Sequence, residues 1–239
     1  DDKAFGKRTP LAAWRKSKPM NTDNTLTSEL DHWIFLQLPK SMKQGCTYTV
    51  CVPEGLGSDV LQASVTFDVW TSQSEAVHVN IIGYSPKEAV KAADLYLWLG
   101  DGGQRDYSTF EGNKVYLYNV DTGAKTKVGS VKFWKEASEH PNEAGEKNLT
   151  GSDVWTVDFK YSKPGRYRLV VDGVGCSMDF YISDDVYFEP YHYSLRGYYY
   201  MRLGEPIDPA ITPVPRQPMF IPEVDPVGFT VYKTDMHPW

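Results

Sequence analysis

Residue types that can carry acid, base or ligand chemistry are scattered along this chain. Asp184 and Asp185 are adjacent carboxylates just before a predicted helix, where capping of the helix N-terminus is favoured over catalysis. Four residues of the C-terminal tail offer a possible sugar or metal contact, but no predicted element positions them: Asp225, Asp235, His237 and Trp239. We therefore predict no catalytic residue in these 239 residues.

The possible metal ligands show no recognised spacing, so neither a metal nor another cofactor is predicted. Four histidines are isolated from one another and are interpreted as structural or solvated: His32, His78, His140 and His192. Residues 100–106 (GDGGQRD) place carboxylates on a turn but lack the spacing of a calcium-binding loop, which favours a solvated turn. Phosphate-loop, nucleophile-elbow and dinucleotide motifs are absent from the sequence.

Four aromatic residues alternate along two predicted strands and could line one face of a sheet: Tyr96, Trp98, Tyr116 and Tyr118. Flat rings can stack on sugar rings, so a carbohydrate-binding surface is one hypothesis. The favoured alternative is that this face packs against a neighbouring part of the protein.

The sequence of residues 75–186 predicts a sandwich of short antiparallel strands. Hydrophobic residues alternate with other side chains in residues 95–99, 115–118 and 154–159, with no amphipathic helix between them. Pro164-Gly165 and Asp172-Gly173 are turn signals on either side of a strand. On the return, one face of a single strand is predicted to hold Cys176, Met178, Phe180 and Ile182.

A different element follows this hairpin. Residues 191–203 predict a helix that ends at Gly204, with an apolar stripe that we expect to pack at a domain junction: Tyr191, Leu195, Tyr198, Tyr199 and Arg202. Tyrosines occur on more than one side, so we expect the helix to pack on the preceding sandwich and also on another chain or the tail. Seven prolines in residues 205–226 make that tail extended.

The first 74 residues predict a small or partial β-sandwich. Residues 1–24 are polar and basic without periodicity and are interpreted as an arm or an incomplete element. Strands are predicted at residues 32–38, 47–53 and 63–70. This is short for an independent immunoglobulin-like domain, which takes about 100 residues, so either the arm completes it or it leans on its neighbour.

Two segments carry a resemblance to a known family. Residues 165–187 (GRYRLVVDGVGCSMDFYISDDVY), followed by residues 194–204 (SLRGYYYMRLG), resemble the end of the immunoglobulin-like domain that precedes the catalytic barrel in family 9 glycoside hydrolases. Residues 77–95 (VHVNIIGYSPKEAVKAADL) resemble the opening strand of that domain, with its Asn-x-x-Gly-Tyr-x-Pro signature. The order and separation of the two segments also match, and the resemblance covers residues 75–204.

The resemblance implies the non-catalytic N-terminal region of an endoglucanase-like, polysaccharide-degrading enzyme, with the helical barrel of the same polypeptide as its partner. The family's catalytic base and acid lie in that barrel, so neither is carried over. The resemblance also implies a bacterial protein that is secreted, periplasmic or on the cell surface. A carbohydrate-binding module and a surface protein-interaction module remain as alternative functions.

Composition limits the partners. A net charge of −6 argues against nucleic acid and anionic membranes, and fits a neutral polysaccharide. No apolar run approaches the ~20 residues of a membrane span. Three cysteines, Cys46, Cys51 and Cys176, form no disulfide framework and are predicted to be free. Because the sequence starts without a methionine or signal peptide, we expect a processed or trimmed chain.

The sequence therefore predicts an all-β chain of tandem immunoglobulin-like sandwiches with a short C-terminal helix and a proline-rich tail. The predicted divisions are residues 1–74, 75–186 and 187–239. We also expect possible self-association through the C-terminal helix.

Overall fold

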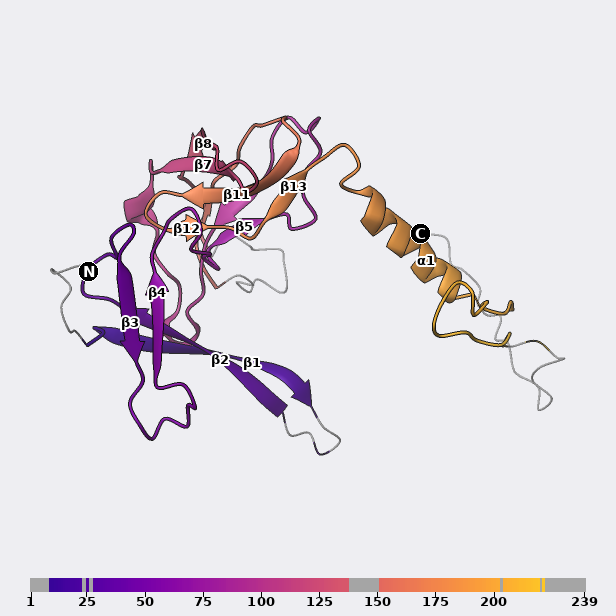
Figure 1. Cartoon of the computed structure of the whole chain (residues 1–239), viewed down its shortest axis with the longest axis horizontal. Coiled ribbons are helices and arrows are strands. Elements are labelled where there is room, and N and C mark those ends of the chain that lie inside the picture. The colour runs from indigo at the N-terminus through magenta and orange to yellow at the C-terminus, as the bar shows by residue number, and fades with distance from the viewer. Residues whose placement is uncertain are drawn as a thin grey trace. The chain divides into compact units, whose positions relative to one another are not determined.

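The computed structural model describes residues 9–22, 25, 28–137, 151–202, 204–219 and 221. The chain divides into two compact units, Asp1–Val186 and Tyr187–Trp239. The first unit is built from antiparallel sheets, and the second contains the α-helix α1 (Phe188–Tyr200) (Figure 1). The expected all-β class with a sandwich and a short C-terminal helix is confirmed.

The sandwich consists of two sheets. The four-stranded sheet has the order β5 (Val77–Val79), β6 (Ala93–Leu95), β10 (Val154–Thr156) and β9 (Lys132–Lys135). The other sheet has the order β12 (Gly175–Cys176), β11 (Gly165–Val171), β7 (Lys114–Asn119) and β8 (Lys125–Ser130), with β13 (Phe180–Ile182) also paired to β11. Two short 3₁₀ turns, η1 (Gly100–Gly102) and η2 (Ser108–Phe110), join β6 to β7.

The core lies between the inner faces of these two sheets. The predicted alternation is confirmed by burial on both sides, with inward residues that include Leu95, Leu117, Trp155, Val157 and Leu169. Burial of such side chains contributes roughly 1.5–3 kcal/mol each. The alternation of apolar residues along these short segments therefore predicted the core-facing residues correctly.

The strand predicted from Cys176 to Ile182 is wrong, because the chain breaks into β12 and β13. Val170 lies opposite Cys176, whereas Tyr167 lies opposite Phe180, so the second strand has one extra residue between the two pairs. A one-residue shift moves side chains to the other face of a sheet. Cys176 is consequently buried on the outer face, Phe180 in the core, and Met178 is 59% exposed.

An ion-pair network occupies this bulge. The Asp179 carboxylate accepts hydrogen bonds from Arg166 Nη2 and Arg168 Nε, each at 2.5 Å. Ser177 adds two more links to Leu169, because its amide donates to the Leu169 carbonyl and its hydroxyl accepts from the Leu169 amide. These bonds replace the regular ladder and hold the shifted register.

Two ribbons precede the sandwich. β1 (Ala12–Thr22) pairs with β2 (Ser28–Gln37), and β3 (Thr47–Cys51) pairs with β4 (Gln62–Thr66), in separate two-stranded sheets (Figure 1). Within the segment interpreted as an arm or incomplete element, residues 12–22 form β1 and pair along nearly all of β2. No described residue before Ala76 belongs to the buried core.

The helix boundaries also differ from the prediction. Asp184 and Asp185 do not cap α1: Tyr187 is at the N-cap without a side-chain bond, Asp184 pairs with Lys87 at 3.4 Å, and Asp185 accepts from the Ser183 hydroxyl. At the other end the C-cap is Met201, so Gly204 does not end the helix. Arg216 supplies the donors there, bonding the Tyr200 carbonyl at 2.9 Å and the Arg202 carbonyl.

Candidate functional site

The two sequence segments that carry the family resemblance meet where the chain leaves the sandwich. A parallel bridge joins Tyr84 to Ile182: the Tyr84 amide donates to the Tyr181 carbonyl at 2.9 Å, and the Ser183 amide donates to the Tyr84 carbonyl at 3.1 Å. The Tyr84 side chain is buried, and its hydroxyl accepts from the Asn80 amide and donates to the Ala92 carbonyl. The signature residues thus form one interlocked turn, which we call the junction turn (residues 80–84).

Each signature residue of the junction turn has a physical role. The Asn80 side-chain oxygen accepts from the Ile82 amide, and the Asn80 carbonyl accepts from the Gly83 amide. Gly83 has φ +116°, and a Cβ there would lie 2.3 Å from the Tyr181 carbonyl oxygen. Only glycine fits at this position. Other residues rarely adopt such a positive φ, and any side chain would collide with the backbone of Tyr181.

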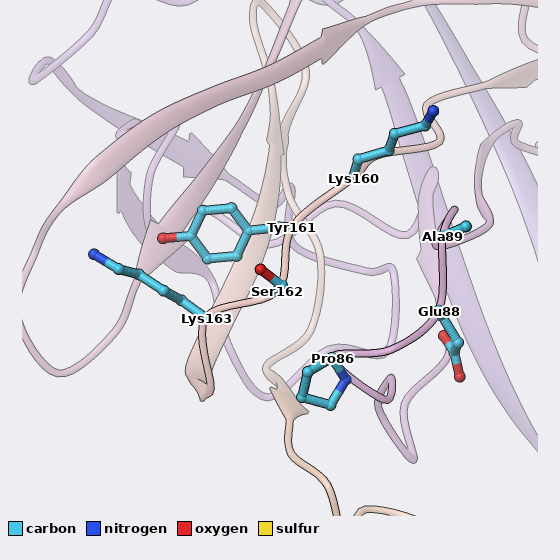
Figure 2. Close-up of a pocket in the computed structure, with 7 residues that line it drawn as sticks. All are labelled: Pro86, Glu88, Ala89, Lys160, Tyr161, Ser162 and Lys163. Carbon is cyan, nitrogen blue, oxygen red and sulfur yellow. The ribbon is translucent and has the colours of Figure 1, made fainter.

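An open groove of about 510 Å³ lies immediately after the junction turn. Pro86, Glu88 and Ala89 form one wall, and residues 160–163 form the other (Figure 2). The charged ends of Glu88, Lys160 and Lys163 point in different directions in this view. The groove contains one carboxylate and no second acid beside it, so its lining does not form the acid–base pair that glycoside hydrolysis needs.

A fully buried lysine lies beside this groove and was missed by sequence reasoning. Lys91 Nζ donates to the Glu88 carbonyl at 3.1 Å, while the Lys91 backbone exchanges two hydrogen bonds with Phe159. Burial lowers the pKa of the Lys91 ammonium, which the charge of Glu88 partly offsets. The residue ties the groove wall to the core, and the alternating pattern around it offered no signal for a buried cation.

The four aromatic residues predicted on one face belong to segments from different sheets. Tyr96 and Trp98 follow β6, the strand of the four-stranded sheet that ends at Leu95, whereas Tyr116 and Tyr118 are on β7 in the other sheet. They therefore do not form one aromatic surface, and the one-face arrangement is corrected. The corresponding β6 and β7 segments have similar alternation, and sequence periodicity does not tell which sheet a strand joins.

Another part of the chain packs against Tyr116 and Tyr118. The Trp70 ring lies 5.4 Å from the ring of Tyr116 and 6.1 Å from that of Tyr118, and Lys125 Nζ is 4.1 Å from the Trp70 ring centroid. Close by, the Cys176 amide donates to the Ser72 carbonyl. The segment that follows β4 is thus bound to the outer face of the sandwich, and these two tyrosines are half-buried beneath it.

Tyr96 and Trp98 have different environments. The Tyr96 ring stacks on His78 with centroids 3.9 Å apart, and His78 Nε2 lies 3.1 Å from the Tyr96 carbonyl. Trp98 lies against Gly151, where a Cβ would be 2.8 Å from the indole, and is 42% exposed. Trp98 alone among the four keeps a substantially exposed ring that could contact a ligand.

Burial determines the titration of His78. Burial lowers the pKa of the His78 imidazole below the ordinary 6.5, and the positive charge of Lys16 lowers it further. The hydrogen bond with the Tyr96 carbonyl and the negative charge of Glu75 raise the pKa, but by less. Between the lowered pKa and 6.5 the unfolded chain binds more protons than the folded one, so stability falls as the pH falls through this range. We predict that urea unfolding at about pH 7.5 and about pH 5.5 shows this loss.

The matched control is His78→Gln, which removes the titrating group. Asp94 acts in the opposite sense, because burial and the neighbouring charge of Asp158 raise the pKa of its carboxyl. The difference between the unaltered chain and His78→Gln isolates His78. An identical pH dependence in both proteins would contradict the assignment.

Within the second unit, three of the residues predicted to pack at a domain junction are exposed on α1. None of the helix residues is buried, and the exposed set includes Tyr191, Leu195 and Tyr198. Arg202 lies over the Tyr199 ring at 4.2 Å. Within the second unit the helix contacts the tail, because Arg196 Nη2 donates to the Ile211 carbonyl at 3.0 Å. Contact with the tail was one of the expected possibilities.

The remaining predicted ligands form no site in the described part of the chain. No group of three histidine, cysteine or acidic side chains gathers there, and no described helix is long and apolar enough to cross a membrane. All three cysteines are free. Five residues named above lie outside the described residues: His140, Asp225, Asp235, His237 and Trp239.

Comparison with known proteins finds a partial likeness to a solved structure. No protein-family model matches the chain, and no curated protein matches it. A solved structure, the crystal structure of a metagenome-derived glycoside hydrolase family 9 endoglucanase, is similar at 26% identity with a TM-score of 0.40. The match covers 59% of this chain and 24% of that one, so the chain matches about a quarter of the endoglucanase's length.

Proposed function

We propose that this chain is a non-catalytic, immunoglobulin-like region of a polysaccharide-degrading glycoside hydrolase of the family 9 type. Its role is to brace the catalytic barrel of the same polypeptide, outside the cytoplasm of a bacterium. The observation that carries the proposal is the junction turn. The two segments on which the resemblance rests lie about 100 residues apart in sequence and are joined by the parallel bridge between Tyr84 and Ile182, whose hydrogen bonds link Tyr84 to Tyr181 and Ser183.

The helix that follows supports a bracing role. α1 exposes Tyr191, Tyr198 and Leu195 together with other large apolar side chains, and monomers rarely leave contiguous apolar patches above ~300–600 Å² uncovered. A large helical domain that follows in the same polypeptide covers this apolar patch. It does so without the loss of translational and rotational entropy that binding a separate molecule entails. The interlocked junction turn gives the sandwich a rigid exit point for that contact.

The decisive experiment is to determine the gene beyond Trp239 and express the protein to its natural end. The proposal expects a helical catalytic domain there, and expects Tyr198→Ser to lower the melting temperature of that domain. Tyr181→Ser is the control, since Tyr181 is exposed on β13 rather than on α1. A frame that closes just after Trp239, or an equal effect of the two substitutions, contradicts the proposal.

The chain alone is expected not to cleave glycosidic bonds, since Glu88 is the single carboxylate lining the groove after the junction turn and hydrolysis needs two. Incubation with cellulose, mixed-linkage glucan and xyloglucan should release no reducing sugar. Turnover that persists through purification and disappears on replacing one Asp or Glu of this chain would overturn the non-catalytic assignment.

A further inference from the structure

The β1–β2 ribbon is seated on the sandwich along β1. The Arg15 amide donates to the Asp101 carboxylate of η1 at 2.7 Å. A Cβ at Gly100 would collide with the Arg15 backbone, and one at Gly102 would collide with the Trp14 indole. The turn η1 can therefore approach β1 this closely only because both positions are glycine, and it forms the seat of the ribbon.

Lys16 makes a further contact between the ribbon and the sandwich. Its Nζ forms an ion pair with Glu75 at 2.8 Å. The same Nζ lies 5.3 Å from the ring centroids of both Trp33 and Phe35, which share one face of the ribbon with it. A cation is attracted both to the face of an aromatic ring and to a carboxylate. Lys16 therefore links the aromatic face of the ribbon to the segment that leads into β5.

His78 lies beside this ion pair on β5, and the charges of Glu75 and Lys16 both act on its imidazole. The ring stacks on Tyr96, and Nε2 lies 3.1 Å from the Tyr96 carbonyl oxygen. Because a carbonyl only accepts, Nε2 carries the proton of the neutral ring and a second proton binds at Nδ1. Acid therefore adds a positive charge near Lys16 without breaking the hydrogen bond that holds the ring.

We propose that the Lys16–Glu75 ion pair is an acid-sensitive latch, and that a positive charge on His78 releases the β1–β2 ribbon from its seat on η1. An ion pair as exposed as this one contributes little to stability, so one added charge beside it can shift the balance. The inference is independent of the proposed function, because none of these residues belongs to the junction turn or to α1.

The sign follows from which charges move with the ribbon. Glu75 and Asp94, which lies opposite His78 in the β5–β6 pair, stay with the sandwich in both states. Lys16 leaves with the ribbon, and in the seated state it lowers the pKa of the imidazole. The released state therefore has the higher His78 pKa, and a bound proton favours release. The effect begins as the pH falls below that higher pKa and reaches its full size below the lower pKa of the seated state.

The first measurement is the titration of His78, followed by NMR in the full chain. Lys16→Met removes the charge and keeps an unbranched side chain. We expect His78 in this variant to bind its second proton about threefold more tightly. Lys18→Met is the control, because Lys18 is exposed two residues further along the same face of β1, opposite Asp31. Unchanged titration in Lys16→Met, or an equal change in Lys18→Met, overturns the proposal.

The second measurement is hydrogen exchange at the Arg15 amide, whose bond to Asp101 breaks when the ribbon leaves its seat. After correction for the intrinsic pH dependence of exchange, its protection should fall several-fold between about pH 7.5 and about pH 5 in the unaltered chain. His78→Gln should keep this protection nearly constant. Lys16→Met should lose protection already at about pH 7.5 and respond less to acid, because it lacks the latch.

Urea separates release of the ribbon from unfolding of the whole unit. A local opening exposes little surface, so exchange at Arg15 should be insensitive to low concentrations of urea, whereas exchange at the core amides of β11 should respond to it. An equal loss of protection in His78→Gln, no loss in the unaltered chain, or a steep urea dependence at Arg15 contradicts the latch.

Discussion

Gly83→Ala is expected to destabilise the first unit by about 3–5 kcal/mol. The substituted Cβ would lie 2.3 Å from the Tyr181 carbonyl oxygen and 2.6 Å from Val186 Cγ2. Relief requires the backbone of one segment to move, which breaks the Tyr84–Tyr181 and Ser183–Tyr84 hydrogen bonds. Strain at a positive φ adds roughly 1–2 kcal/mol to the loss.

Gly112→Ala is the matched control. Gly112 also has a positive φ, +82°, but no atom lies within 4 Å of its substituted Cβ. This variant should therefore lose only the stability that a positive φ costs an alanine, about 1–2 kcal/mol. Chemical denaturation followed by tryptophan fluorescence measures both variants. If the two losses are equal, the close approach at the junction turn does not exist and the assignment of the signature is wrong.

Phe180→Ala is expected to cost about 3–5 kcal/mol, whereas Met178→Ala should change stability by less than about 0.5 kcal/mol. The Phe180 ring lies 5.3 Å from that of Tyr84 and 5.9 Å from that of Phe159, in the centre of the core. Met178 is two residues earlier, and the bulge leaves it exposed.

This pair tests the register directly. In an uninterrupted strand Met178 and Phe180 would share a face and lose comparable stability on truncation. A large loss for both variants would therefore contradict the bulge, as would a small loss for both. Thermal and urea unfolding of each variant, compared with the unaltered chain, provide the measurement.

The sequence alone determined the class of the fold and the position of its core. Period-two alternation at Leu95, Leu117, Trp155 and Leu169 identified inward-facing residues, because the side-chain direction along a strand follows from local backbone geometry. The turn dipeptide Asp172-Gly173 likewise marked the hairpin between β11 and β12. Gly83 and Tyr84 are identifiable from the sequence motif without knowledge of their contacts.

Pairing and register were decided by the tertiary structure. The bulge at residues 177–179 depends on Asp179 reaching Arg166 and Arg168 on the neighbouring strand, a contact that local periodicity does not contain. Tyr96 follows β6 and Tyr116 lies on β7, and these strands belong to different sheets although both segments show similar alternation. The end of α1 was similarly set by Arg216, which donates to the last carbonyls from 16 residues away. Each of these features rests on a partner distant in sequence, whereas the features read correctly rest on neighbours along one strand or turn.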